Sequence, residues 1–426
     1  MDTLSSKCNL PPEKVFSIQI GSEVFRLSGA SIASDAPSYF SRFFEEQLLH
    51  QDAANIRTLY IDRDPMTFRE IARHLQGYHV RPQDGAQYVK LFADAQFYTL
   101  PRLMSQMFES ECFIQIGDRH FQIPRDIFSG PGDAPNFFTL GFAAFFASPT
   151  EVFPGLDRQG LLRPPAIVPP SVPNRSADVF DELLHLLRGY PLHIRNEDHR
   201  ASLLRDCRYF HLRGLEQKLI PHQITTNPFS QRLEIVIRLE DVRPSGIQFT
   251  FDAVSGLPTV GGNVTYMRPF VDENAADLVV EIGDESSLIH RGSMRADFLG
   301  LSKQRISSLL QTLGKKMKLS DSHPPLGQVP IKVRVDRETD LTVDGEQDPR
   351  HLMIPRVNAE AGTDCVPPAK RPRVDDTDDG LCVVRTGQWR LQVQKGSTGA
   401  YEVVLVAVKL DVYTSSQVRN RSRKFL

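Results

Sequence analysis

The amino-terminal half of this chain repeats itself. The segment FSIQIGSEVFRL, which begins at Phe16, returns as CFIQIGDRHFQI from Cys112, at an offset of 96 residues. Each copy alternates apolar and polar residues, breaks at a glycine and alternates again, which predicts a two-stranded hairpin with one buried face. A long repeat in the sequence indicates a repeated structural unit. The chain is therefore expected to contain two copies of one small α+β module.

Three further blocks recur in the same order. They are DAPSYF at 35–40 with DAPNFF at 133–138, FREIARHLQGY at 68–78 with FDELLHLLRGY at 180–190, and AQFYTL at 95–100 with CRYFHL at 207–212. Ser38 and Asn136 suit the N-cap of the helix that each aromatic pair begins. The second block has the apolar spacing of a helix and ends in a glycine, which favours helix termination.

The two copies differ in length. The offset rises from 98 to 112 between the first and second of these blocks, so the second copy carries about fourteen extra residues. Seven prolines lie in this part of the chain, and such a density excludes regular structure. We therefore expect a first module at 14–110 and a second at 111–222, with a proline-rich surface insertion at 142–175.

This order of elements resembles the BTB/POZ domain, in particular the potassium-channel tetramerisation type. The positions that carry the resemblance are Ile18, Ile20, Gly21, Phe25, Tyr39, Phe40, Asp62, Asp64, Pro65, Phe68, Gly77 and Tyr78, with Ile114, Ile116, Gly117, Phe121, Phe137, Phe138, Phe180, Gly189 and Tyr190 in the second copy. The second copy has PNRS from Pro173 where the first has IDRDP from Ile61, so its third strand is not predicted.

The resemblance implies a protein that binds proteins. Modules of this type are expected to self-associate side by side, and a cullin-type ubiquitin ligase is among the partners that the family permits. The arrangement is also similar to fungal proteins with paired domains of this type. No apolar run of membrane-spanning length follows the modules, so a channel-type domain here implies nothing about conduction.

The second half of the chain has a different pattern. Segments 233–239, 331–335, 389–393 and 403–412 read as strands, and the apolar spacing from Ile306 to Met317 predicts one helix. We expect a β-rich α+β domain at 228–426, interrupted by a polar, acidic and disordered loop at 341–380. The predicted fold class is α+β, with two consecutive BTB/POZ-like modules followed by this domain.

Composition and motifs argue against catalysis. The formal net charge of −2 predicts no general attraction to nucleic acid or membranes, and the five cysteines include no CxxC pair. His185, His193 and His199 lack partners at zinc-ligand spacing. No nucleotide-binding or hydrolase motif occurs. We predict no catalytic, cofactor-binding or metal-binding residues and, since no signal peptide is evident, an intracellular soluble protein.

One short motif predicts localisation. The segment PPAKRPRVDD resembles a monopartite nuclear localisation signal, with Lys370, Arg371 and Arg373 as the basic core that an import receptor would bind. Prolines keep the segment extended, as binding in a receptor groove requires. A solvated charge cluster is the alternative. The motif predicts a protein of nucleus and cytoplasm.

Two functions remain open at this point. The leading hypothesis is a non-enzymatic scaffold or adaptor, with a ubiquitin-ligase substrate adaptor as one form of it. The alternative is a nuclear chromatin or transcription cofactor that contacts nucleic acid through Lys315, Lys316, Lys318 and the tail at 419–424. Nucleic-acid contacts are expected to weaken steeply with salt, which discriminates the two. An enzyme ranks last.

Overall fold

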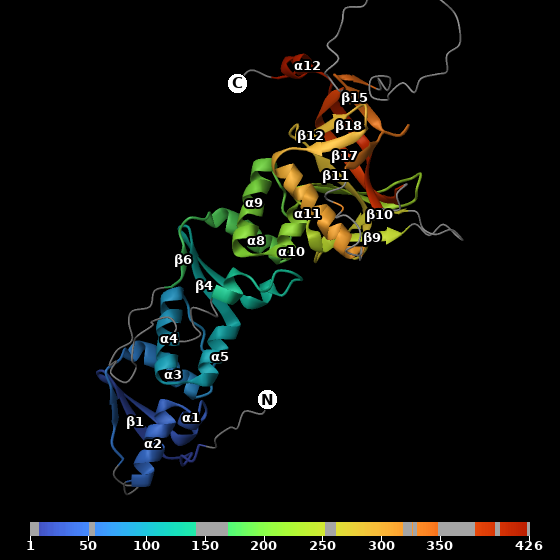
Figure 1. Cartoon of the computed structure of the whole chain (residues 1–426). Coiled ribbons are helices and arrows are strands. Elements are labelled where there is room, and N and C mark those ends of the chain that lie inside the picture. Colours follow the sequence, from blue (N-terminus) through green and yellow to red (C-terminus); the bar gives the residue numbers. More distant parts are fainter. Residues whose placement is uncertain are drawn as a thin grey trace, which may run out of the picture. The chain divides into compact units, whose positions relative to one another are not determined.

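The computed structural model describes residues 8–50, 56–141, 169–251, 261–317, 326, 330–347, 380–396 and 401–423. The chain divides into two compact units, Met1–Glu216 and Gln217–Leu426. Each unit is described by itself below, with its elements labelled in Figure 1.

The first module begins with the predicted hairpin. Its elements in order are β1 (Val15–Ile20), β2 (Glu23–Ser28), α1 (Gly29–Ala33), α2 (Tyr39–His50), β3 (Leu59–Ile61), α3 (Pro65–Leu75), α4 (Gly85–Phe97) and α5 (Pro101–Ser110). Strand β1 is central: it pairs with β2 antiparallel and with β3 parallel. Its inner face, with Phe16, Ile18 and Ile20, is fully buried.

The same layout follows directly in the second set of elements. These are β4 (Glu111–Ile116), β5 (Arg119–Pro124), the 3-10 helix η1 (Arg125–Phe128), β6 (Ser171–Val172), α8 (Ala177–Leu187), α9 (Glu197–Phe210) and α10 (Arg213–Leu219). Strand order β5-β4-β6 matches β2-β1-β3, again with one antiparallel and one parallel pair. A third strand that the sequence did not predict is therefore present, as the two-residue β6.

Helix boundaries follow local chemistry in both copies. Asp64 caps α3 by accepting a hydrogen bond from the Met66 N–H at 3.1 Å, with Pro65 in the first turn. Ser176 plays the same part for α8 by accepting from Val179. Helix α3 is followed by Gly77 at φ +92°, a conformation that glycine adopts without steric cost.

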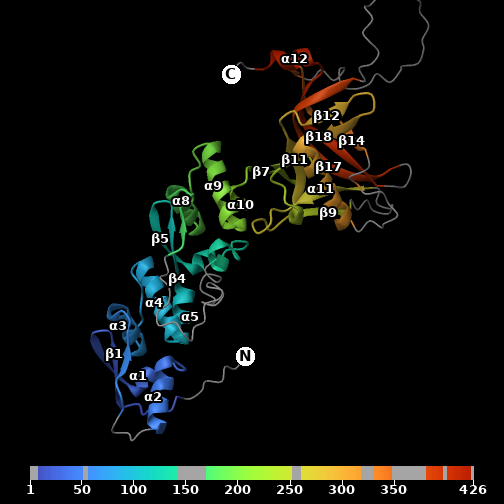
Figure 2. The same ribbon diagram turned by 60° about the vertical axis from the view of Figure 1, so that its left-hand side comes forward.

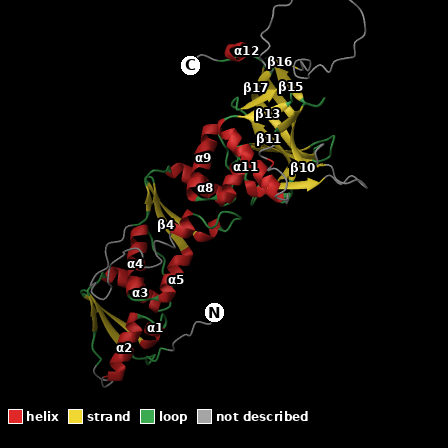
Figure 3. Ribbon diagram, in the orientation of Figure 1, coloured by secondary structure: helices red, strands yellow, loops and turns green. Residues whose placement is uncertain are grey.

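The second unit is dominated by one large sheet, drawn in yellow in Figure 3. Its strands are β7 (His222–Thr226), β8 (Leu233–Arg238), β9 (Ile247–Phe251), β10 (Gly261–Tyr266), β11 (Ala276–Ile282), β12 (Ser287–His290), β13 (Arg295–Phe298), β14 (Ile331–Arg334), β15 (Asp340–Val343), β16 (Glu346–Gln347), β17 (Leu381–Lys395) and β18 (Tyr401–Tyr413). The short 3-10 helix η3 (Pro244–Gly246) and α11 (Gly300–Lys316) lie against it, and α12 (Ser416–Arg421) follows β18.

Strands β17 and β18 organise this sheet. Strand β17 pairs with β12 near its start and with β11 and β10 further on, while β18 pairs with β14, β15 and β17. Two irregularities in the β17–β18 register accompany this change of partners. The prediction of a central strand at 403–412 is confirmed, and so is the helix from Ile306.

Three predicted boundaries differ from the structure. The second unit begins before residue 228, because β7 pairs with β8 and joins its sheet. The loop expected at 341–380 contains β15 and β16, since Leu341 and Val343 are buried against the sheet while residues 348–379 lie outside the described residues. Of the insertion expected at 142–175, residues 169–175 belong to the second module.

Helices of the described residues are all too short or too polar to cross a membrane.

Candidate protein-interaction site

Each module is built around four aromatic rings. In the first, the ring of Phe68 lies 4.8 Å from Phe25, 5.6 Å from Phe40 and 5.6 Å from Tyr98, measured between ring centres. Phe40 and Tyr98 are also 4.7 Å apart. Aromatic pairs at such spacings add stability beyond the burial of their surface. The cluster joins the hairpin, α2, α3 and the end of α4 into one core.

The second module repeats this cluster with Phe121, Phe138, Phe180 and Phe210. Phe180 lies 4.9 Å from Phe121, 5.5 Å from Phe138 and 5.0 Å from Phe210. Phe138 and Phe210 are 5.2 Å apart. Every ring of the first cluster thus has a counterpart at the matching position of the sequence repeat.

A buried aspartate caps the last helix of the first module from a distance. The Asp35 carboxylate is fully buried and accepts hydrogen bonds from the backbone N–H groups of Arg102 at 2.7 Å and Leu103 at 3.0 Å. It also lies 2.9 Å from Nε2 of His74. Leu100, the residue at the N-cap of α5, provides no capping side chain, so Asp35 accepts the hydrogen bonds of these first-turn N–H groups instead.

Asp133 does the same in the second module. Its carboxylate accepts the backbone N–H of Leu215 at 2.9 Å, in the first turn of α10. Gly214 lies so close that a Cβ there would approach the Asp133 carboxylate oxygens to about 3 Å. The repeated DAP block therefore has a structural role: its aspartate ties the start of a module to its final helix.

A buried ion pair links the segment after β3 to α4 in the first module. Arg63 Nη1 lies 2.5 Å from Asp94 Oδ1, and the guanidinium lies 4.0 Å from the ring centre of Phe97. Burial raises the pKa of Asp94 to about 6, although Arg63 acts in the opposite direction. Burial therefore outweighs the nearby positive charge.

The second module has the same pair. Arg175 lies 3.1 Å from Asp206 and stacks 4.2 Å from the ring centre of Tyr209. Burial also raises the pKa of Asp206, against the effect of Arg175. The pair is thus a feature of both copies, although the PNRS segment gave little sign of it in the sequence.

We expect Asp94 to make the chain less stable as pH rises. Its pKa of about 6 in the folded protein exceeds the value of about 3.9 for an unfolded chain, so its contribution is fully present below about pH 4 and is lost as pH rises through about 6. Compared with the Asp94→Asn variant, the free energy of unfolding of the unaltered protein should fall by about 2–3 kcal/mol as pH rises over that range. Urea unfolding of both proteins at pH 4.5 and pH 7 measures the difference. A difference that stays constant, or changes sign, would contradict the dominance of burial.

The two modules contact each other through α4, α5 and β4. Figures 1 and 2 both show these helices of the first module beside the first strand of the second. The ring of Tyr88 lies 4.9 Å from that of Phe113, and both side chains are buried, with 1% and 3% of their surface exposed. The Tyr88 hydroxyl donates to the Met107 carbonyl at 3.1 Å. A helix face of one module thus covers the sheet of the next.

Polar groups surround this aromatic contact. The buried Glu111 carboxylate forms an ion pair with Arg81 of the first module and accepts a hydrogen bond from Gln122 at 2.6 Å. The guanidinium of Arg125, from the second module, lies 4.2 Å from the ring centre of Phe108 in α5. Charged groups of both modules therefore find partners across the contact.

The central strands β1 and β4 differ in burial because of this contact. Strand β1 alternates between buried and accessible residues, whereas all but one residue of β4 are buried. Phe113 stands where the first copy has Ser17, and Glu111 where it has Val15. One face of β4 packs on its own module and the other on α4. On the corresponding outer face of β1, Val15 is exposed, and Ser17 and Gln19 are partly exposed.

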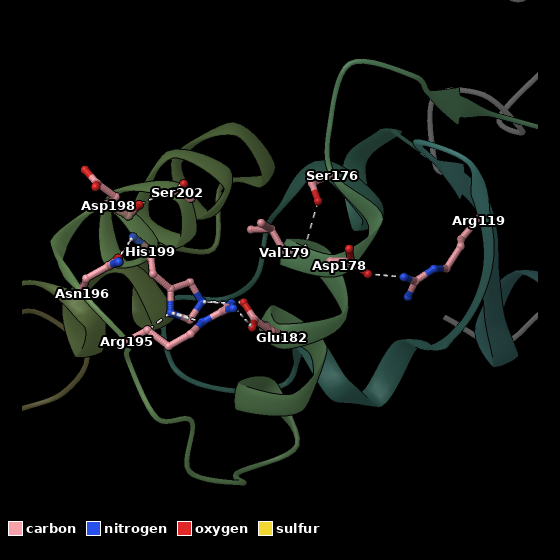
Figure 4. Close-up of polar contacts among 10 residues, drawn as sticks. All are labelled: Arg119, Ser176, Asp178, Val179, Glu182, Arg195, Asn196, Asp198, His199 and Ser202. Carbon is pink, nitrogen blue, oxygen red and sulfur yellow. Dashed lines mark hydrogen bonds and ion pairs between the residues drawn. The ribbon is translucent and has the colours of Figure 1, made fainter.

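A polar cluster joins α8 to α9 (Figure 4). Glu182 lies 2.7 Å from Nε2 of His199 and 3.0 Å from the guanidinium of Arg195. Asn196 caps α9 by accepting the His199 N–H at 2.8 Å. Such contacts fix the loop before α9. Within the described parts of the chain, no three His, Cys, Asp or Glu side chains gather as metal ligands would.

Only some of the basic residues predicted to act in nuclear import or nucleic-acid binding lie among the described residues. Lys370, Arg371 and Arg373 lie outside the described residues, as do Lys318 and Lys424. Lys315 and Lys316 are exposed at the end of α11. Arg419 in α12 donates to Glu285 at 2.5 Å, so this charge already has a partner.

The positions that carry the BTB/POZ resemblance include both buried and exposed side chains. Fully buried side chains are Ile18, Ile20, Phe40, Phe68, Ile114, Ile116, Phe138 and Phe180. Tyr39, Tyr78 and Tyr190 are exposed. The residues of the contact between modules, Tyr88 and Phe113, were not among the predicted positions. A comparison of the two copies could have found them, because Phe113 replaces a serine and Tyr88 is matched by Arg200.

Comparison with known proteins bears on the first module. Residues 16–108 match the family model described as the BTB/POZ domain. The match does not extend to the second copy.

Two proteins of Saccharomyces cerevisiae are similar to a longer part of the chain. One, named Uncharacterized protein YDR132C, is 38% identical over 261 residues, which cover 59% of this chain and 51% of that protein. The other, BTB/POZ domain-containing protein YLR108C, is 35% identical over 252 residues, with 59% and 49% covered. The chain thus spans about half the length of these relatives. Residues 16–108 are a BTB/POZ domain of the potassium-channel tetramerisation type, a class that implies protein–protein interaction and oligomerisation.

Proposed function

We propose that the chain is a non-enzymatic scaffold that binds proteins through two tandem BTB/POZ-like modules. The observation that carries the proposal is the contact of Tyr88 with Phe113, in which a helix face of one module covers the sheet of the next. A contact between modules inside one chain supports protein binding by modules of this type. Assignment of the second copy to the same family is supported by its strand order, its four-ring cluster and its capping aspartate.

The proposal predicts self-association. On the outer face of the first sheet Val15, Val24 and Tyr60 are each more than half exposed, and exposed apolar patches mark interaction surfaces. Sedimentation velocity of the full chain over a concentration series should show a mass that rises above one chain. A mass of one chain at every concentration would count against self-association and leave only the internal pairing of modules.

A ubiquitin-ligase substrate adaptor is the narrower form of this proposal. It needs a module that binds a cullin and a separate part that binds a substrate. The second compact unit, Gln217–Leu426, is the candidate for the substrate-binding part. Direct binding of the purified chain to a purified cullin tests this form, and no binding at micromolar concentration would remove it while leaving the scaffold.

The alternative, a chromatin or transcription cofactor, depends on free positive charge. Lys315 and Lys316 are exposed and favour it, whereas the ion pair of Arg419 with Glu285 removes one charge of the tail. DNA binding that falls steeply between low and physiological salt would support it. Absence of DNA binding at low salt would exclude it.

We also propose nuclear import through the basic core at Lys370, Arg371 and Arg373. Replacing all three by alanine removes the charges that a receptor would bind, so nuclear accumulation of a fluorescent fusion should fall severalfold. The control variant replaces Lys315 and Lys316 by alanine, which changes exposed charge elsewhere. An unchanged nuclear signal in the triple variant would refute the proposal.

A further inference from the structure

The outer face of the first sheet carries apolar side chains. Register places Tyr60 beside Gln19 and Gln19 beside Val24, so the three form one row across β3, β1 and β2. Tyr60 is 59% exposed, Val24 56% and Val15, at the start of β1, 60%. These side chains take no part in the core of the module, because the core is formed by the opposite face of the same strands.

The second module has no such row. The register of β4 puts Ser171 at the position of Tyr60, Gln115 at that of Gln19 and His120 at that of Val24. The copy whose sheet is partly covered inside the chain is therefore polar at these positions, and the copy whose sheet is open is apolar. Exposed apolar residues that cluster on one face indicate a binding surface.

A second copy could reach this face in two ways. In a head-to-tail contact, α9 of one chain would cover the sheet of the next, as α4 covers β4. Helix α9 lacks the required surface: Arg200 stands where α4 has Tyr88, and Glu197 where it has Gly85. Gly85 lies next to Phe113, because a Cβ built at this glycine would be in van der Waals contact with Phe113 at 3.6 Å. Arg200 and Glu197 form an ion pair on the helix surface.

A face-to-face contact has no such obstacle. With a two-fold axis parallel to β1, strand β1 lies over β1 of the partner, and β2 lies over the partner's β3. Tyr60 then meets Val24 of the second copy twice, and Val15 meets its own equivalent. Arg26, an exposed charge of β2 on this face, falls opposite the β3 end of the partner's sheet rather than a second arginine. The face is therefore complementary to itself.

We propose that the outer face of the first sheet is the docking surface for a second copy of this chain, in a two-fold dimer. The inference rests on the proposed self-association and specifies its surface. It predicts a two-fold dimer, because α9 lacks the side chains with which α4 would extend the contact head to tail.

The test compares equivalent positions in the two modules. Full-length Tyr60→Glu and Val24→Glu place a charge at the centre of the proposed contact, and each should weaken dimerisation by more than about 30-fold in sedimentation equilibrium. Ser171→Glu and His120→Glu introduce the same charge at the matching positions of the second module and should leave dimerisation unchanged. Circular dichroism of each variant verifies its fold.

A second measurement is independent of charge. Gln19 lies over its own equivalent across the two-fold axis, so Gln19→Cys should form a disulfide-linked dimer on mild oxidation, and adding Tyr60→Glu should abolish it. If the unaltered chain is monomeric throughout, the proposed self-association fails together with this inference. If it dimerises but Tyr60→Glu and Val24→Glu are without effect, or Arg200→Glu abolishes the dimer, this surface is wrong and the self-association stands.

Discussion

Tyr88→Ala is expected to destabilise the contact between the modules by about 3–5 kcal/mol, the cost of removing a large aromatic side chain from a core. Tyr88 lies on α4, and its ring is almost fully buried against Phe113 of β4. Its hydroxyl donates a hydrogen bond to the Met107 carbonyl. Hydrogen exchange by mass spectrometry should show faster exchange in the peptides of β4 and β5 than in the unaltered chain.

Arg200→Ala provides the matched control. Arg200 occupies the position of Tyr88 in the second module, but it is only partly buried, and its ion-pair partner Glu197 is exposed. Surface ion pairs contribute little, so its removal should cost less than about 1 kcal/mol. Equal effects of the two substitutions would mean that α4 and α9 have similar environments, contrary to the structure.

Asp35→Ala is expected to cost about 2–4 kcal/mol. The substitution leaves the backbone N–H groups of Arg102 and Leu103 without their acceptor in a buried place, and His74 without its carboxylate. A buried donor that loses its partner costs about 1–3 kcal/mol, more when the lost partner is charged. Urea unfolding, followed by the circular dichroism of the chain, should show the loss as an earlier transition.

Asp64→Ala separates the effect of burial from that of capping. Asp64 also caps a helix, but it is exposed, so water can replace it. Its substitution should cost about 1 kcal/mol, the usual value for an N-cap. A loss for Asp35→Ala that is no greater than this would show that the distant carboxylate is not structurally important.

The repeat in the sequence was sufficient to predict the hairpins and the helices that end just before Gly77 and Gly189, because both depend on local patterns. Alternation of side chains and a glycine turn act within a few residues, and they reappear in the second copy at matching positions. The capping roles of Asp35 and Asp133 were not predictable in this way. Each aspartate binds amides far along the chain, and only the folded module brings them together.

Strands whose partners are distant were the least predictable. Strand β6 has two residues, and its pairing with β4 depends on the fold rather than on its own composition. Strands β15 and β16 lie at the start of a polar segment, so the segment reads as a loop, yet β15 pairs with β18. In both cases the backbone hydrogen bonds of a neighbouring strand outweigh weak local preference.

The contact between the modules is marked in the sequence by positions where the two copies differ. A repeat is recognised by positions that agree, whereas Phe113 and Tyr88 are positions where the copies differ. Each module has an outer sheet face and an outer helix face. Inside the chain, the helix face of the first module packs on the sheet face of the second. Differences between the copies therefore mark the surfaces that are used internally and those that stay open.

A double-mutant cycle between Tyr88 and Phe113 tests the central claim, that the first module covers the sheet of the second. The stabilities of the unaltered chain, Tyr88→Ala, Phe113→Ala and the double variant are measured from the exchange of β4 amides. For rings 4.9 Å apart we expect a coupling energy of about 0.5–1.5 kcal/mol. Additive effects, with a coupling energy near zero, would contradict it.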